Sequence, residues 1–154
     1  MKKHLAQLNI SRIIPETMEN PIMNDFVAQL DTINALAESS KGFIWRLKGD
    51  DNNATNFRPF DDDRVIVNMS VWESAEGLME FVYKSAHTMV MKDRNKWFEN
   101  MESLQPYFGT LKKDTFQLFK KPVNDWNIFK QTEQRILPLI LKIGFSATNK
   151  LDHR

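Results

Sequence analysis

The clearest hydrophobic pattern in the chain is the alternation of VIVNMSVW at 65–72. Successive side chains of a strand point to opposite faces of a sheet, so one face is uniformly apolar while the other carries Asn68 and Ser70 beside Trp72. From Ser74, which suits a helix N-cap, apolar residues recur at helical spacing. We therefore predict a core strand followed by one long helix, which reaches Met101 and packs back over that strand.

One stripe of this helix mixes apolar and aromatic side chains with a histidine and an arginine: Met79, Tyr83, His87, Val90, Arg94, Trp97, Phe98 and Met101. His87 has two interpretations, a general base or ligand whose pKa is shifted by burial, or a hydrogen-bonded packing residue. Arg94 either binds an anionic ligand or reaches past the edge of the core to a carboxylate. The pattern alone does not separate these alternatives.

Three further elements are predicted ahead of this stretch. A loosely alternating strand covers 4–14, and a helix covers 21–38 behind Asn20, a residue that favours the N-cap position. A second strand covers 43–48 and has one apolar, aromatic face. We expect Trp45, on that face, to share a core with the helix.

The segment 49–64, GDDNNATNFRPFDDDR, is polar and long for a connection between two strands. Its Asp and Asn residues lack the ligand spacing, the central glycine and the terminal glutamate of an EF-hand, so we expect a solvated loop and no metal site. Arg58 lies between Phe57 and Phe60, whose rings are suited to hold its guanidinium over a cleft.

Composition narrows the class of protein. The chain has 154 residues, 42% of them hydrophobic, which fits one domain with a single core. Its net charge of +1 argues against nucleic-acid binding. It contains no cysteine, no apolar stretch typical of a signal peptide and no run of about 20 apolar residues, so we expect a cytoplasmic protein without a membrane span.

The runs HLAQLNI, FIWRL, RPFDD, VNMSVWES and FVYKSAH, all within residues 1–101, resemble an uncharacterised bacterial family of domains of unknown function with the dimeric α+β barrel fold. The resemblance implies a ferredoxin-like α+β domain, built on a split βαβ unit, over residues 1–107. It also implies a homodimer formed through the open face of the sheet, and a pocket between sheet and helices. Proteins of this fold include cofactor-independent monooxygenases and haem-handling enzymes, so fold alone leaves function open.

Residues 108–154 form an atypical tail that does not resemble the end of that family. The family continues with a strand like LWWVPAGHIPT and a helix like EAxERLEYL, whereas here the net charge changes from −4 over 1–107 to +5 over 108–154. With suitable synonymous codons, the shifted frame from Tyr107 reads LWYIKKGHIPTIQEACERLEYFQTNG. We therefore interpret the residues from between Ser103 and Phe108 to the end as out-of-frame translation.

The alternative is that the tail evolved as it stands. In that case 115–120 (TFQLFK) supplies the fourth strand of the sheet by simple alternation, and 136–145 forms a short apolar helix or strand.

Two classes of function remain open. In the first, the domain is a small-molecule enzyme of the monooxygenase or haem-handling kind, with His87 as base or axial haem ligand and Asn68 as a hydrogen-bond donor to a substrate oxygen. Its pocket for a small apolar or aromatic ligand is then lined by Trp45, Trp72, Tyr83, Arg94 and Trp97. In the second, the domain is a non-catalytic dimerising or ligand-binding module. The sequence itself requires no cofactor.

Overall fold

The computed structural model describes residues 3–49, 51–58, 60–100 and 107–112. Its elements are β1 (Lys3–Arg12), the short 3-10 helix η1 (Pro21–Met23), α1 (Asn24–Ser39), β2 (Phe43–Arg46), β3 (Val65–Trp72), α2 (Ala75–Lys84), α3 (His87–Asp93), the 3-10 helix η2 (Arg94–Lys96) and β4 (Tyr107–Lys112). By its contacts the chain divides into two compact units, Lys3–Thr110 and Met1–Lys2 with Leu111–Arg154. The first unit holds every described helix and the whole of β1, β2 and β3.

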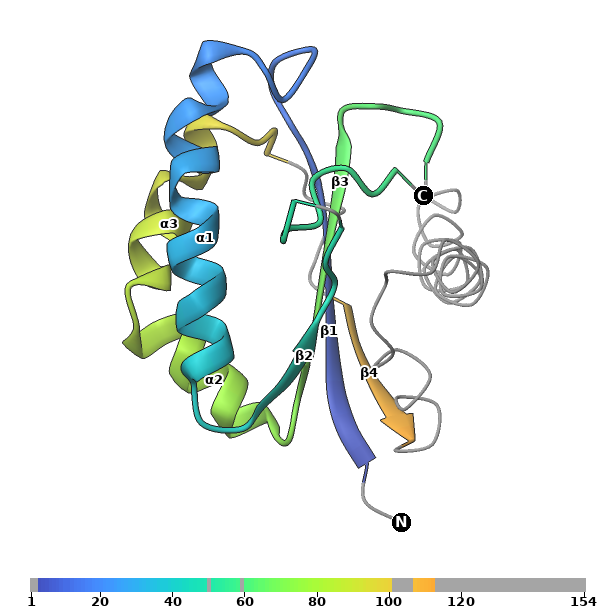
Figure 1. Ribbon diagram of the computed structural model, residues 1–154, viewed down its shortest axis with the longest axis vertical. Coiled ribbons are helices and arrows are strands. Elements are labelled where there is room, and N and C mark those ends of the chain that lie inside the picture. Colours follow the sequence, from blue (N-terminus) through green and yellow to red (C-terminus); the bar gives the residue numbers. More distant parts are fainter. Residues whose placement is uncertain (1–2, 50, 59, 101–106, 113–154) are drawn as a thin grey trace, which may run out of the picture. The chain divides into compact units, whose positions relative to one another are not determined.

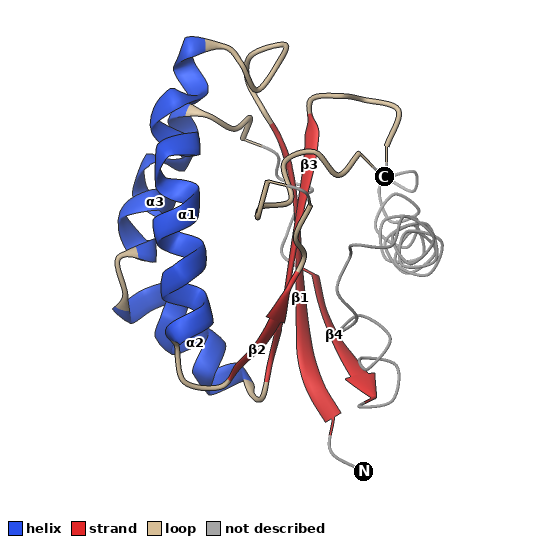
Figure 2. Ribbon diagram, in the orientation of Figure 1, coloured by secondary structure: helices blue, strands red, loops and turns tan. Residues whose placement is uncertain are grey.

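The strands form one four-stranded sheet in the order β2-β3-β1-β4 (Figure 1). The strand β3 is antiparallel to both β1 and β2. Helices α1, α2 and α3 lie together on one face of this sheet (Figure 2). This order and connectivity are those of a ferredoxin-like split βαβ unit, so the predicted fold class is confirmed. None of the described helices is both long enough and apolar enough to cross a membrane.

The two faces of the sheet differ as the alternation of β3 predicts. Along β1 and β3, one set of paired residues is apolar and buried: Ala6, Leu8, Ile10, Val67, Met69 and Val71. The opposite set includes Trp72, which packs against Leu78 and Phe81 of α2. The second set therefore lies on the face that the helices cover.

A β-bulge in β2 changes the prediction for Trp45. Phe43 pairs with Trp72, but the register shifts before Trp45, which pairs with Val71. One extra residue in a strand moves the following side chains to the other face. Trp45 therefore lies on the face away from α1, and the expectation that it shares a core with that helix is wrong.

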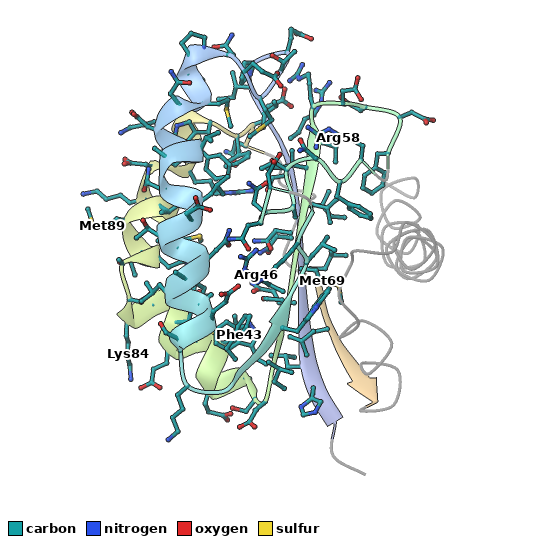
Figure 3. All side chains as sticks on the ribbon, in the orientation of Figure 1. Phe43, Arg46, Arg58, Met69, Lys84 and Met89 are labelled. Carbon is teal, nitrogen blue, oxygen red and sulfur yellow. The ribbon has the colours of Figure 1, made fainter. Side chains whose placement is uncertain are left out.

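The predicted long helix is broken at Ser85, whose backbone is extended. Its hydroxyl donates to the carbonyl of Phe81 and accepts from the backbone N–H of His87, so it ends α2 and opens α3. The break interrupts the predicted stripe. Tyr83, a member of the stripe, is 63% exposed. Met89, which is not a member, is 69% exposed and projects from the outer side of the helices (Figure 3).

Two apolar clusters fill the space between the sheet and the helices. The first consists of Ala37, Trp72, Leu78 and Phe81, with Leu5, Ile33, Leu36, Phe43 and Val82 against it. The second consists of Ile13, Met23, Ile66, Trp97 and Phe98, with Met18, Phe26 and Val90 against it. Because Ile66 and Trp72 belong to different clusters, the middle of β3 lies between them.

The tail lies almost entirely outside the described residues, including both 115–120 and 136–145. The fourth strand of the sheet is β4 at Tyr107–Lys112, earlier than the tail alternative expects. The interpretation of the tail as out-of-frame translation stays a prediction.

Candidate functional site

The middle of the helix-facing side of the sheet is polar. Its residues, which we call the polar band, are Gln7, Asn9 and Ser11 from β1 with Asn68 and Ser70 from β3. Strand pairing sets Gln7 opposite Ser70 and Asn9 opposite Asn68. The band therefore separates the two apolar clusters.

Asn68 is exposed although it lies in the middle of a strand and on the covered face. Its neighbours on the same face at either side of the band are buried: Ile66 is 9% exposed and Trp72 is 0% exposed. Solvent therefore reaches the sheet between the two clusters, at the side-chain amide of Asn68.

Trp72 closes one end of the polar band. Its indole Nε1 donates to Ser70 Oγ at 2.9 Å, and Ser70 Oγ donates to Gln7 Oε1 at 3.4 Å. The Trp72 ring stacks on Phe81 with a centroid distance of 5.3 Å. These contacts satisfy the indole N–H and fix the polar groups beside it.

His87 begins α3 and is half-buried. The centroid of its ring lies 4.8 Å from that of Phe81, and the Phe81 ring in turn stacks on Trp72. Burial lowers the pKa of His87 below its ordinary value of 6.5, and the backbone of Val82 opposes part of this shift. His87 is therefore neutral at pH 7, the form that accepts a proton.

Arg94 lies at the other end of the polar band. Its Nη2 donates to Ser11 Oγ at 3.4 Å, and its guanidinium carbon is 6.0 Å from the centre of the Phe98 ring. The side chain is half-buried. Arg94 thus adds a positive charge beside the neutral amides of the band.

The remaining predicted pocket residues lie elsewhere. Trp97 is 2% exposed and packs on Phe26 at a centroid distance of 5.6 Å, inside the second cluster. Tyr83 faces solvent and Trp45 lies on the opposite side of the sheet. The structure therefore places Asn68, Trp72 and Arg94 on the helix-facing side, while His87 contacts Phe81, which in turn stacks on Trp72.

Sequence reasoning missed three members of the polar band, Gln7, Asn9 and Ser11. Their signal was present, since they alternate with the buried apolar residues of β1 just as Asn68 and Ser70 alternate in β3. The sequence does not show which strands pair or in which register, so it could not reveal that Asn9 lies opposite Asn68.

Arg58 does not extend over a cleft. Its Nη1 donates to the backbone carbonyls of Thr55 and Phe57 in its own loop. A second arginine, Arg46, is buried in the domain with 4% of its surface exposed. Its Nε donates to Glu38 Oε1 at 2.9 Å. It ties β2 to α1 and has a structural role.

The described residues include no group of three or more acidic, histidine or cysteine side chains that could hold a metal ion. They also do not fit haem at His87. A porphyrin needs a broad apolar slot beside its axial ligand. Here the apolar side chains are packed into the two clusters, and the accessible surface between them is the polar band.

The sheet order and the one-sided helix layer define a protein of the dimeric α+β barrel fold class. One solved structure with this arrangement is a conserved protein of unknown function from Bacteroides thetaiotaomicron VPI-5482, described as a possible oxidoreductase. It is 12% identical, with a TM-score of 0.50, over 72% of this chain and 100% of that one. At this identity the likeness shows the fold.

The chain belongs to the family DUF3291, a domain of unknown function, whose model matches residues 4–113. Two further structures are similar at lower TM-scores. SnoaB, a cofactor-independent oxygenase from Streptomyces nogalater, is 10% identical over 80% of this chain and 99% of its own, with a TM-score of 0.48. PA3566 from Pseudomonas aeruginosa is 11% identical over 73% and 96%, also with a TM-score of 0.48. No curated protein sequence matches the chain.

Proposed function

We propose that this domain binds a small organic molecule on the polar band, between the sheet and the helices. The observation that carries the proposal is the exposure of Asn68 between Ile66 and Trp72, both buried on the same face. A sheet face covered by helices is normally apolar along its length. An accessible polar stretch flanked by two apolar clusters has the composition of a ligand site.

The side chains of the band define the chemistry of its ligand. The amides of Asn68 and Asn9 each offer two N–H donors and one carbonyl acceptor. The apolar clusters that contain Trp72 and Phe98 border the band at either end but are themselves packed, so the polar groups of the band determine what binds there. The ligand is therefore a small organic compound that carries a hydroxyl or carbonyl oxygen, and a phenol is a suitable probe for it.

A direct test uses a neutral probe, 4-hydroxybenzamide, and the backbone amide spectrum of the 15N-labelled protein. We expect the probe to shift the signals of Asn68 and Asn9, and Asn68→Leu to weaken its binding by about tenfold, the effect of losing one or two hydrogen bonds. Asn95→Leu, the same change at an exposed residue of η2, is the matched control. Equal binding by both variants, or no binding of this probe by the wild type, would sink the proposal.

The neutral state of His87 supports a catalytic version of the same proposal, of the cofactor-independent monooxygenase kind. This version requires His87, whose ring contacts Phe81, to come within hydrogen-bond distance of a phenolic hydroxyl held at Asn68; His87 then accepts the proton of that hydroxyl, and the amide of Asn68 stabilises the oxyanion that forms. Dioxygen is the oxidant of the later steps. Oxygen uptake with an electron-rich phenol should be lost in His87→Gln; uptake that is absent in the wild type or unchanged in the variant leaves only ligand binding.

We also propose that the domain acts as a homodimer through the sheet face away from the helices. That face is apolar from Ala6 to Ile10 and from Val67 to Val71, which is the composition of a face that packs against another sheet. Light scattering of a version in which the shifted reading frame replaces the tail should give twice the mass of one such chain. The mass of a single chain at every concentration would contradict this.

A further inference from the structure

Each of the other partly or fully buried arginines that bind side chains pairs with a carboxylate, whereas Arg94 has no such partner among the described residues. Arg12 pairs with Asp62 at 2.8 Å, Arg46 pairs with Glu38 at 2.9 Å, and Arg64 pairs with Glu99. Among the described residues, no carboxylate pairs with Arg94. Its only polar partner there is the neutral hydroxyl of Ser11.

The surroundings of Arg94 fit a cation that is held in place for an anion. The Phe98 ring, 6.0 Å from the guanidinium carbon, offers its negative face to the guanidinium and limits its movement. Ser11 Oγ, at 3.4 Å, occupies one nitrogen, and no other acceptor among the described residues occupies the remaining N–H groups. A guanidinium of this kind binds a carboxylate through two parallel hydrogen bonds.

We infer that the ligand of the polar band is an anion, and that Arg94 binds its carboxylate. This inference rests on the proposed function, because Arg94 reaches the band only through Ser11, two residues from Asn9 on the same face of β1. Arg94 binds the charged end of the ligand, and the amides of Asn9 and Asn68 bind its neutral oxygen.

Strand geometry sets the size of that ligand. Residues two apart on a strand are separated by about 7 Å, so the anion site at Ser11 and the amide site at Asn9 and Asn68 are one aromatic ring apart. A benzoic acid with a hydroxyl group in the para position places a carboxylate and a hydroxyl at opposite ends of one ring. The ligand class is therefore that of para-hydroxylated aromatic carboxylates.

The experiment compares two probes of nearly equal shape, 4-hydroxybenzoate and 4-hydroxybenzamide, by calorimetric titration. We expect the wild type to bind the carboxylate at least tenfold more tightly than the amide, since a charge-assisted bidentate pair is about twice as strong as neutral hydrogen bonds. Arg94→Gln should remove this preference and leave the affinity for the amide unchanged. Arg94→Lys should restore part of it, because the charge stays while the bidentate geometry is lost.

Lys92→Gln is the matched control, because it removes an exposed positive charge from the neighbouring turn of α3 and should change neither affinity. Equal affinity for the two probes in the wild type overturns the inference and leaves the proposed function standing. Equal losses in Arg94→Gln and Lys92→Gln also overturn it, because the effect is then general charge. If the wild type does not bind 4-hydroxybenzamide, the proposed function fails, and the inference that rests on it fails with it.

Discussion

Arg46 is a charged side chain inside the core that joins three parts of the domain. It projects from β2 into the space between the sheet and α1 (Figure 3) and is 4% exposed. Its Nη1 donates to the carbonyl of Asn52 at 2.7 Å and its Nη2 to Asn52 Oδ1 at 3.1 Å, in addition to the bond to Glu38. We predict that Arg46→Met destabilises the domain by about 2 kcal/mol and releases the loop at Asn52.

The magnitude follows from what each partner retains. Loss of three hydrogen bonds costs about 1 kcal/mol each, and more where a charge takes part. Glu38 is 37% exposed and keeps Lys48 at 2.7 Å, so it is left neither buried nor unpaired. The methionine fills the volume of the arginine stem and removes the cost of a buried cation, which keeps the loss below the roughly 3–5 kcal/mol of a broken buried ion pair.

Two assays measure the two consequences of this change. Urea denaturation gives the free energy of unfolding. Thermolysin, which cuts before large apolar residues, reports on the loop through Phe57, whose 7% exposure protects it in the wild type. Cleavage there should become faster in Arg46→Met under native conditions.

The matched control is Lys48→Met, which removes the other cation bound to Glu38. Lys48 is 44% exposed, so its ion pair contributes at most about 1 kcal/mol, and the loop should stay protected. If both variants lose the same free energy of unfolding, burial does not determine how much the ion pairs of Glu38 with Arg46 and Lys48 contribute, and the reasoning is refuted. Unchanged cleavage at Phe57 in Arg46→Met would refute the role of Arg46 in holding the loop.

Three further predictions concern the histidine, the second cluster and the tail. Because burial lowers the pKa of His87, the unfolded chain takes up a proton more readily than the folded one. The free energy of unfolding is therefore not reduced by His87 above about pH 6.5, the pKa of the unfolded chain. It falls as the pH drops toward the pKa of the folded state, by up to about 1.4 kcal/mol per pH unit. His87→Gln should remove that part of the slope in urea denaturation at several pH values; an unchanged slope contradicts the assignment. Trp97→Ala should cost about 3–5 kcal/mol and Tyr83→Ala about 0.5 kcal/mol in the same assay, since one side chain is 2% exposed and the other 63%. The version with the shifted frame after Tyr107 should melt at a higher temperature than the chain as written; equal melting temperatures contradict the frame interpretation.

Local patterns predicted the parts of the fold that local chemistry determines. The faces of β3 follow from strict alternation, and Trp72 and Val71 lie on opposite sides as expected. The caps were also readable: Asn20 Oδ1 accepts from the backbone N–H of Ile22, and Ser74 Oγ from that of Gly77. In each case the interacting groups lie within a few residues of each other.

The errors arise where a single residue shifts everything that follows it. The bulge between Phe43 and Trp45 reverses the faces of β2, and no glycine lies within it to mark it in the sequence. Ser85 interrupts a pattern that continues at helical spacing on both sides, because a serine side chain competes with the helix for backbone groups. A fixed periodicity cannot represent either event.

The role of each arginine depends on partners that are remote in sequence, which is why the two interpretations of Arg94 stayed open. Asp62 and Glu99 lie 50 and 87 residues from Arg12, and only the pairing of strands brings them together. Once these carboxylates are assigned to Arg12 and Arg64, none of the described residues supplies one to Arg94. A guanidinium that is held beside the polar band keeps its capacity for two parallel hydrogen bonds to an anion. The absence of a carboxylate partner within the described part of the domain therefore favours the first interpretation, an anionic ligand.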